Sequence, residues 1–112
     1  MDKLSKYRKI ITSILQKQAS FGSSDGEIDD YAVCDEKTDN YILLNVGWYN
    51  KKRRQHGFPI HIRIKDSKVW VEWDGTDQEI VQQLIDNGIP PEDIVLGFQH
   101  SQTHLANELI AA

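Results

Sequence analysis

The sequence predicts an α+β fold with an N-terminal helix, a four-stranded antiparallel meander sheet, and C-terminal helices packed on one sheet face. Three observations predict this class. The start of the chain places apolar residues at helical spacing, the middle alternates apolar and polar residues with a period of two, and helical spacing returns after residue 76. Strands grouped between helices are typical of α+β domains.

Length and composition indicate one domain, residues 1–112. The chain has 112 residues, of which 39% are hydrophobic, and this is enough for one modest core. Its charged start has neither the apolar stretch nor the cleavage site of a signal peptide, so we expect a cytoplasmic protein without a membrane segment. Cys34 is the single cysteine, and we expect it to be a buried structural thiol.

The first helix is predicted to run through the first 19 to 22 residues. Its apolar stripe follows helical spacing and consists of Leu4, Tyr7, Ile11, Ile14 and Leu15. The run FGSSDGEIDD that follows, residues 21–30, is rich in turn-forming Gly, Ser and Asp. We interpret it as a loop that leads into the sheet.

The first two strands are predicted from a period of two on either side of a turn at residues 36–39. One face is expected to carry Tyr31, Val33, Ile42, Leu44, Val46 and Trp48. Tyr41 and Leu43 place apolar side chains on the opposite face as well. A strand that is apolar on both faces indicates a central position in the sheet.

The third and fourth strands are predicted to form a hairpin around the two-residue turn Asp66-Ser67. The third strand alternates Phe58, Ile60, Ile62 and Ile64 with polar residues, and the fourth alternates Val69, Val71 and Trp73. If Lys65 lies opposite Lys68, the core face pairs Ile64 with Val69, Ile62 with Val71, and Ile60 with Trp73.

The C-terminal third of the chain is predicted to hold two helices. In DQEIVQQLIDNG, residues 77–88, apolar residues recur at helical spacing, Thr76 or Asp77 can cap the start, and Gly88 can end the helix. Residues 90–93 suit a short turn, and residues 94–98 suit a brief buried segment. A last helix is indicated by Leu105, Leu109 and Ile110.

The non-core face of the hairpin holds the residues best suited to chemistry. The predicted register brings Arg63 beside Trp70 as a cation–π contact, and His61 beside Glu72 as an ion pair. Such a face could be a recognition patch, or an acid–base pair assisted by Asp74. Ordinary cross-strand pairing on a wet sheet face accounts for the same residues and is favoured.

Cofactor and metal motifs are absent from the sequence. There is no GxxxxGK[ST] or GxGxxG loop for a nucleotide. His100 and His104 are four residues apart and could share one helical face as a metal pair, but no third ligand accompanies them, which favours surface histidines. We therefore expect neither a metal nor a cofactor.

A basic run interrupts this acidic chain in WYNKKRRQHG, residues 48–57. Lys51, Lys52, Arg53 and Arg54 fall between the second and third predicted strands, where a hairpin loop over residues 51–56 would keep the tip solvated. Binding of nucleic acid by these cations is the alternative. The net charge of −4 and the pI near 5.5 do not favour DNA binding by the chain alone.

Three stretches resemble the XisI-like family, the fdxN element excision controlling factor proteins of cyanobacteria. They are HIRIKDSKVWVEWDGT (61–76), GIPPEDIVLGFQH (88–100) and GWYNKKRRQHG (47–57). The resemblance implies a non-enzymatic accessory role in the excision of a DNA element. In that role members of the family act beside a recombinase and a nuclease-like XisH protein.

The resemblance implies a protein partner resembling XisH, with DNA contact inside such a complex, and it supplies no catalytic residues. A homo-oligomer that covers one sheet face is a further expectation. Direct DNA binding through the basic run, and a small enzyme that uses His61, Glu72 and Asp74, remain the alternatives. The candidate contact residues are Lys51, Lys52, Arg53, Arg54, His56, His61, Arg63, Lys68 and Trp70. The family-motif residues expected to serve the fold are Gly47, Trp48, Asp74, Thr76, Pro90, Asp93, Gly97 and Phe98.

Overall fold

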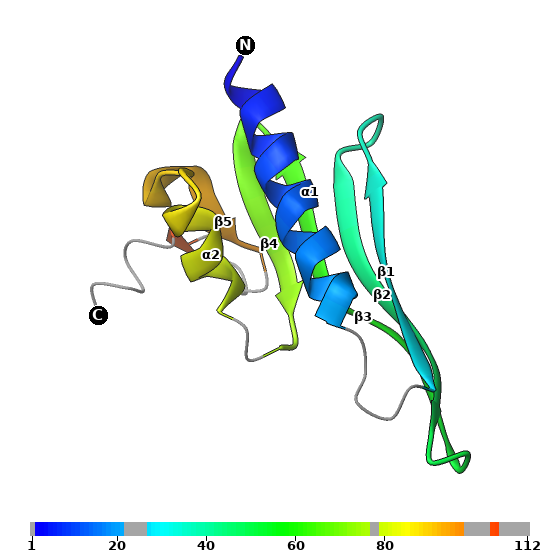
Figure 1. The fold of residues 1–112 in the computed structure, drawn as a ribbon. Helices are drawn as coiled ribbons and strands as arrows, with labels where there is room; N and C mark the ends of the chain where they lie inside the picture. The colour runs from blue at the N-terminus through cyan, green and yellow to red at the C-terminus, as the bar shows by residue number, and fades with distance from the viewer. Residues whose placement is uncertain (1, 22–26, 77–78, 98–103, 106–112) are drawn as a thin grey trace.

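The computed structural model describes residues 2–21, 27–76, 79–97 and 104–105 (Figure 1). Its elements in chain order are α1 (Lys3–Phe21), β1 (Ile28–Asp35), β2 (Asn40–Tyr49), β3 (Arg53–Lys65), β4 (Lys68–Asp74), α2 (Ile80–Asp86), the 3-10 helix η1 (Pro91–Asp93), β5 (Ile94–Leu96) and β6 (His104–Leu105). The α+β class predicted from the sequence is confirmed.

The six strands form one mixed sheet in the order β1-β2-β3-β4-β5-β6. Strands β1 to β4 are antiparallel neighbours, so the predicted meander is correct for this part. The prediction was incomplete because β5 adds in parallel to β4 and β6 pairs antiparallel to β5. The crossover through α2 and η1 returns the chain in the direction of β4, which is why β5 is parallel.

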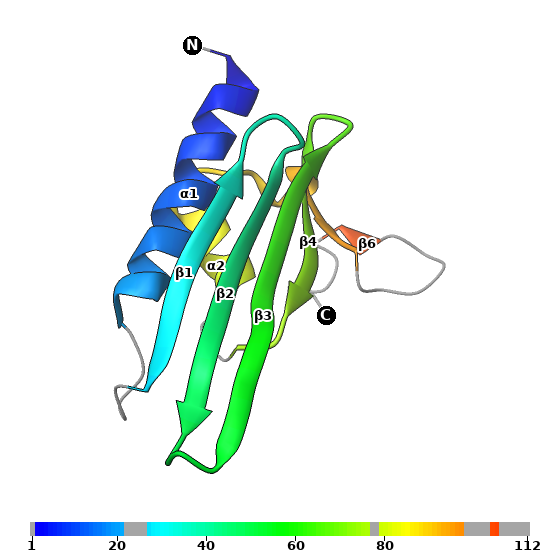
Figure 2. The ribbon, with the colours of Figure 1, turned by 90° about the vertical axis from the view of Figure 1, so that its right-hand side faces the viewer.

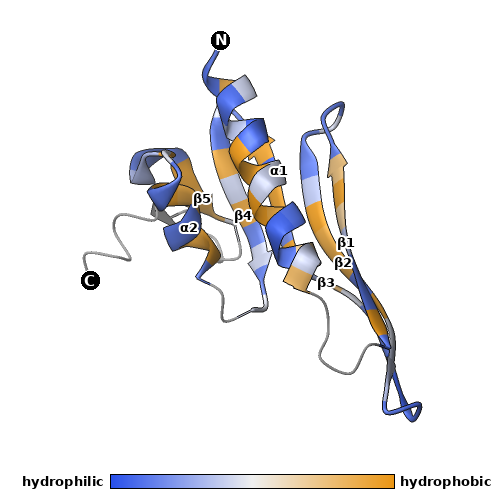
Figure 3. Ribbon diagram, in the orientation of Figure 1, coloured by the Kyte–Doolittle hydropathy of each residue, from blue (hydrophilic) through white to orange (hydrophobic). Residues whose placement is uncertain are grey.

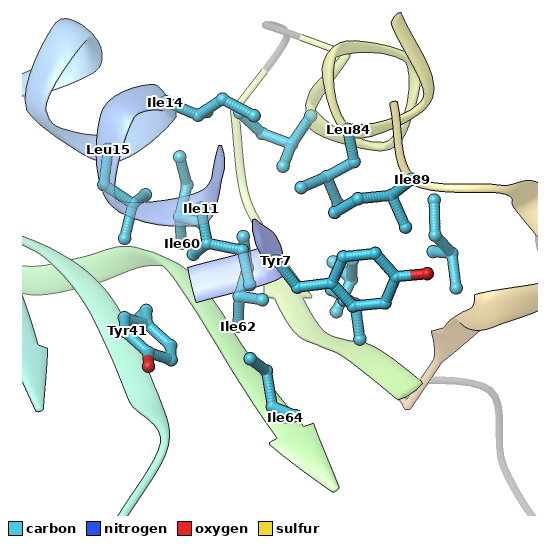
Figure 4. Close-up of a cluster of buried hydrophobic side chains, with 14 of the residues drawn as sticks. Tyr7, Ile11, Ile14, Leu15, Tyr41, Ile60, Ile62, Ile64, Leu84 and Ile89 are labelled. Carbon is cyan, nitrogen blue, oxygen red and sulfur yellow. The ribbon is translucent and has the colours of Figure 1, made fainter. Parts of the chain in front are cut away.

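Helices α1 and α2 cover the same face of the sheet. In Figure 2 both helices lie behind β1–β4, and no described element lies in front of these strands. Apolar side chains from the two helices and from β2 to β5 meet between these layers (Figure 4). The fully buried members with the largest side chains are Tyr41, Ile11, Leu15, Ile60, Ile62, Ile80, Leu84, Ile89 and Ile94. Full burial of an aliphatic side chain of this size contributes about 1.5–3 kcal/mol.

The helices follow their predicted apolar stripes. Tyr7, Ile11 and Leu15 of α1 are buried, and the helix ends at Phe21 as expected. Helix α2 begins only at Ile80, after Glu79 in the left-handed region, and no described side chain caps it. Thr76 therefore lies outside the helix instead of capping it, while Asp77 lies outside the described residues.

The end of α2 is closed as predicted by Gly88. This glycine has φ +113°, and its N–H donates to the carbonyl of Ile85 while the N–H of Ile89 donates to that of Leu84. The last predicted helix is not confirmed, because Leu105 belongs to β6. Leu109 and Ile110 lie outside the described residues.

The β3–β4 hairpin confirms the predicted register in the part next to its turn. Lys65 pairs with Lys68, Ile64 with Val69, and Ile62 with Val71. Both turn residues, Asp66 and Ser67, have positive φ, as a type I′ turn requires.

A bulge breaks the rest of the β3–β4 register. Ile62 pairs with Val71 but His61 pairs with Trp73, so Glu72 is the extra residue of β4. The predictions that Ile60 pairs with Trp73 and that His61 lies beside Glu72 are therefore wrong. Trp73 does not join the core, and 53% of its surface is exposed.

A second bulge lies between β2 and β3. Leu43 pairs with Ile60 and Asn45 with Gly57, so Phe58 and Pro59 together oppose Leu44. The predicted alternation of Phe58 with Ile60 is wrong for this reason. Phe58 is 55% exposed, and its ring lies edge-on to that of His61, 6.5 Å away.

Strand β1 departs from two predictions. It begins at Ile28, so residues 28–30 belong to the sheet and not to the predicted loop. Cys34 is exposed rather than buried, because it lies beside the β1–β2 turn on the edge strand of the sheet.

Two polar clusters fix α1 to the sheet. The Arg8 guanidinium binds both carboxylate oxygens of Asp39 at 2.8 and 3.1 Å, and the Tyr41 hydroxyl donates to the same carboxylate at 2.8 Å. At the other cluster, the Tyr7 hydroxyl donates to Asp93 of η1. Burial of the phenol and this hydrogen bond both raise the pKa of Tyr7.

Neither helix in the described part of the chain has the length and apolar composition that a membrane crossing needs.

We expect Asp39→Asn to lower the free energy of unfolding near neutral pH by about 1–2 kcal/mol, because Arg8 loses a charged acceptor. The hydrogen bond from Arg8 lowers the pKa of Asp39. Its stabilisation is therefore present above the unfolded-state pKa of about 4 and is lost as the pH falls through the folded-state value. Urea unfolding followed by tryptophan fluorescence, near neutral pH and in acid, measures the effect. Equal loss of stability in acid for wild type and variant would contradict this assignment.

Candidate functional site

The face of β1–β4 turned away from the helices, here called the open face, carries most of the exposed large apolar side chains. Its members with 45–55% of their surface exposed are Tyr31, Val33, Trp48, Phe58 and Trp73. Cross-strand pairing places Tyr31 beside Leu44, and Val33 beside Ile42, as predicted for one shared face. The prediction that this face continues along β2 is confirmed, but it is the uncovered face and not the core.

His61 lies at the centre of the open face. Its Nε2 is 2.9 Å from the Asn40 side-chain oxygen, and its cross-strand neighbours are Ile42 on β2 and Trp73 on β4. The imidazole is thus surrounded by Phe58 and Trp73 as well as by the amide. It does not pair with Glu72 as the sequence predicted.

Arg63, and not His61, is the partner of Glu72. Its guanidinium forms an ion pair with Glu72 and lies 5.9 Å from the centre of the Trp70 ring, so the predicted cation–π contact is present. Lys65 approaches the same ring at 5.3 Å, and the indole N–H donates to the Lys65 carbonyl at 3.1 Å. The charges of Arg63 and Glu72 are therefore already paired within the protein.

The three residues of the enzyme alternative do not converge. His61 binds Asn40, Glu72 binds Arg63, and the Asp74 carboxylate accepts the N–H and hydroxyl of Thr76 at 3.0 and 2.7 Å. The last contact is the strand-to-helix turn that was expected after β4. A shared acid–base function for these residues finds no support in this geometry.

Beyond the last β1 and β4 pairs, β2 and β3 continue as a two-stranded projection, here called the basic ribbon, residues 48–55. The pairing of β1 with β2 stops at Gly47, and that of β4 with β3 stops at Ile60. Figure 1 shows this projection extending past the ends of α1 and β4, and its tip is hydrophilic in Figure 3. The turn itself is Asn50–Lys52, since Arg53 and Arg54 belong to β3. The prediction of a loop over residues 51–56 is therefore too long.

Both arginines of the basic ribbon stack on aromatic rings of the opposite strand. Arg54 pairs with Trp48, and its guanidinium lies 5.6 Å from the ring centre; Arg53 pairs with Tyr49 at 5.5 Å. Successive residues of a strand point to opposite faces, so the two stacked pairs lie on opposite faces of the ribbon. This stacking was not predicted from the sequence, because it depends on the register of the hairpin.

Charge is strongly divided between this hairpin and the rest of the molecule. All 17 acidic residues lie outside residues 41–65, whereas 6 of the 13 Lys and Arg lie inside that range. The hairpin therefore carries +6 and the remaining chain −10. Four of these cations lie together in residues 51–54, whereas Arg63 and Lys65 lie at the other end of β3, where Arg63 is paired with Glu72. The overall charge of −4 thus conceals a positive tip.

Glu27 anchors the basic ribbon to the start of β1. Its carboxylate accepts the N–H of Lys51 at 3.0 Å, its carbonyl accepts the N–H of Trp48 at 3.1 Å, and the three residues line one hollow. A Cβ on Gly47 would lie 2.0 Å from the Glu27 carbonyl oxygen. Gly47 thus permits this close approach of the two strands.

The remaining motif residues lie near η1 and β5. Lys68 donates to the Glu92 carbonyl at 2.9 Å and lies 3.9 Å from Asp93, so its ammonium holds the 3-10 helix. Pro90 precedes that helix, and the N–H of Gly97 donates to the Val71 carbonyl at 3.0 Å. Phe98 lies outside the described residues.

Asp93 was expected to serve the fold, and its partners explain how. Burial alone would raise the pKa of this carboxyl, but the Tyr7 hydroxyl and the Lys3 ammonium, which is 3.0 Å away, lower it. Sequence reasoning missed Tyr7, Lys3 and Arg8 as polar anchors. Each lies far along the chain from its partner, and no spacing rule links them.

The alternative of a metal pair on one helical turn finds no support, because His104 belongs to β6. His100 lies outside the described residues. Among residues 2–21, 27–76, 79–97 and 104–105, no three His, Cys, Asp or Glu side chains are grouped to hold a metal ion.

The fold and its surfaces define an α+β protein whose mixed sheet has all of its described helices on one face. The chain belongs to the XisI family, since the family model for "XisI protein" matches residues 1–109. A XisI-like protein from Anabaena variabilis has a similar structure, with a TM-score of 0.79, 36% identity, and coverage of 87% of this chain and 88% of that one.

The fdxN element excision controlling factor XisI of the same organism is similar at a TM-score of 0.74 and 36% identity, covering 89% of this chain and 96% of that one. No curated protein matches the sequence.

We expect Gly47→Ala to destabilise the protein by about 1–3 kcal/mol, because the added Cβ would also lie 2.7 Å from the Ile28 Cα and would force β1 away from β2. Gly57→Ala is the matched control on β3, where the nearest atom to the new Cβ is the Asn45 side-chain oxygen at 3.8 Å. Its expected change is below about 0.5 kcal/mol. Urea unfolding of both variants measures the difference, and similar stabilities would contradict the close strand approach.

Proposed function

We propose that this chain is a non-enzymatic accessory factor that controls excision of a DNA element by binding a protein partner resembling XisH. Family membership supports the role, because one structural relative is named an fdxN element excision controlling factor. The exposed apolar side chains of the open face are the observation that supports binding of a protein partner. Five large apolar side chains there keep 45% or more of their surface exposed.

The composition of the open face fits the centre of a protein interface. Exposed apolar patches mark interaction sites, and Trp, Tyr, Phe and Arg are enriched where binding energy concentrates. An aromatic side chain such as Trp73 or Phe58 removes about 150–250 Å² of surface from water when it is fully buried. These two rings flank His61 at the centre of the face.

The polar groups between these rings favour binding over catalysis. His61 is bonded to Asn40, and Arg63 is paired with Glu72, so a partner would cover groups that already have protein partners. Covering satisfied groups avoids the cost of leaving a buried donor or acceptor unpaired.

A second copy of the chain is the competing occupant of the open face. Sheet-on-sheet packing of two identical faces would bury the same aromatic side chains. The XisH-like partner is preferred because it also accounts for an accessory role, and the mass of the particle in solution distinguishes the two.

We expect the Phe58→Ser/Trp73→Ser variant to lose a complex with the XisH-like protein encoded in the same genome, because two central apolar contacts are removed. Loss of one interface hot spot costs about 2 kcal/mol or more, so affinity should fall at least 30-fold. Co-purification and size-exclusion chromatography with light scattering measure the complex.

Phe21→Ser is the matched control. Phe21 is 62% exposed at the end of α1, on the helix-covered side of the sheet. This variant should bind as the wild type does. The proposed partner would be contradicted if both variants lost the complex equally or if the wild type formed no complex. It would also be contradicted if the wild type formed a dimer that the Phe58→Ser/Trp73→Ser substitutions dissociate.

The role itself is testable with a plasmid-borne element, its recombinase and the XisH-like protein. Quantitative amplification across the rejoined junction should show excision with the wild-type chain and at least tenfold less with the Phe58→Ser/Trp73→Ser variant. Equal excision with no chain present would contradict a controlling role.

A further inference from the structure

We infer that the basic ribbon is a contact arm for the phosphate backbone of duplex DNA. This surface meets the open face at Trp48, on which Arg54 stacks, but binding by its cations does not depend on the partner proposed for that face. Its four cations, Lys51, Lys52, Arg53 and Arg54, are all exposed. The hairpin itself, residues 41–65, contains no carboxylate, and the Glu27 carboxylate, which contacts the turn, accepts the backbone N–H of Lys51.

The shape of the basic ribbon suits a groove. Residues 48–55 have neither β1 nor β4 beside them, so only two strands project from the body. The major groove of B-DNA is about 12 Å wide and admits a two-stranded ribbon. Arg53 and Arg54 extend from opposite faces, so a ribbon that enters the groove edge-on directs one guanidinium toward each phosphate wall.

The arginines are also held in place before any ligand arrives. Each guanidinium lies against an aromatic ring of the facing strand, Arg53 on Tyr49 and Arg54 on Trp48. Stacking leaves the N–H groups at the edge of the guanidinium plane free to donate to phosphate oxygens. Less side-chain freedom is then lost on binding.

The same stacking disfavours single-stranded nucleic acid. A strand of bases would bind by stacking on exposed aromatic faces. On the basic ribbon, one face of Trp48 and one face of Tyr49 are already covered by arginine. Contact with phosphates of a duplex uses the guanidinium edges and leaves both stacked pairs intact.

The charge of the rest of the molecule explains why the contact is confined to the projection. Outside residues 41–65 the chain carries −10 and repels a polyanion. The tip lies beyond α1 and β4 in Figures 1 and 2, where it can reach phosphates while the acidic body stays away. Binding by this arm alone is therefore weak and independent of base sequence.

Fluorescence anisotropy of the full chain with a labelled duplex of about 20 base pairs tests the inference. Four phosphate contacts predict a slope of about −3.6 in log K against log salt, so affinity should fall about 100-fold between about 50 and 200 mM NaCl. Replacing all four cations by Gln should weaken binding at least tenfold at the lower salt and bring the slope near zero.

The matched control removes the same charge from exposed lysines elsewhere. Its substitutions are Lys6→Gln, Lys9→Gln, Lys17→Gln and Lys37→Gln. This variant should keep the wild-type slope. A smaller variant, Lys51→Gln/Lys52→Gln, leaves both stacked arginines in place and should lower the slope by about two.

Four outcomes would overturn the inference. The first is that the wild type does not bind the duplex at low salt, and the second is that the control and the fourfold ribbon variant lose equal duplex affinity. The third is that a single strand binds more tightly than the duplex. The fourth is that a ribbon variant no longer binds the protein partner but binds the duplex as the wild type does. The last outcome would make the ribbon a protein contact. It differs from failure of the open-face proposal, which concerns the Phe58→Ser/Trp73→Ser variant.

Discussion

The packing of α1 on the sheet is the interaction on which the rest of the structure depends. Ile11 and Leu15 of the helix and Ile60 and Ile62 of the strand are completely buried. Side chains alternate along a strand, so when these two isoleucines of β3 pack against the helix, the residues next to them point to the other face of the sheet. His61 and its strand companions are therefore displayed opposite the core. The sheet thus has one face that builds the core and one that no described helix covers.

Two β-bulges add aromatic side chains to the open face. Strict alternation would have turned Phe58 and Trp73 toward the core, as the sequence suggested. An extra residue on β3 and another on β4 rotate both rings outward instead. Each outward ring gives up its share of core burial, and Phe58 retains an edge-on contact with His61. Protein surfaces rarely expose such rings together without a binding role.

The periodic parts of the fold were predictable, and the irregular parts were not. Helix α1, strands β1–β4 and the Asp66-Ser67 turn follow from spacing and turn chemistry, because both are local. The bulge at Glu72 leaves no mark in the sequence, so the predicted His61 pairing failed with the register. Strand β5 has only three residues, too few for a period to show. The positive charge of residues 51–54 was visible, but the stacking of Arg53 and Arg54 required the three-dimensional pairing.

The exposed Cys34 has a practical consequence. As the single cysteine, it accepts one thiol-reactive dye at one defined position. It faces Tyr41 near the start of β2, whereas the tip of the basic ribbon follows Tyr49 at the other end. At about 3.3 Å per residue, the dye would lie roughly 25–30 Å from that tip. A donor there and an acceptor on a bound molecule would report which end of the protein is engaged, with the native chain otherwise unchanged.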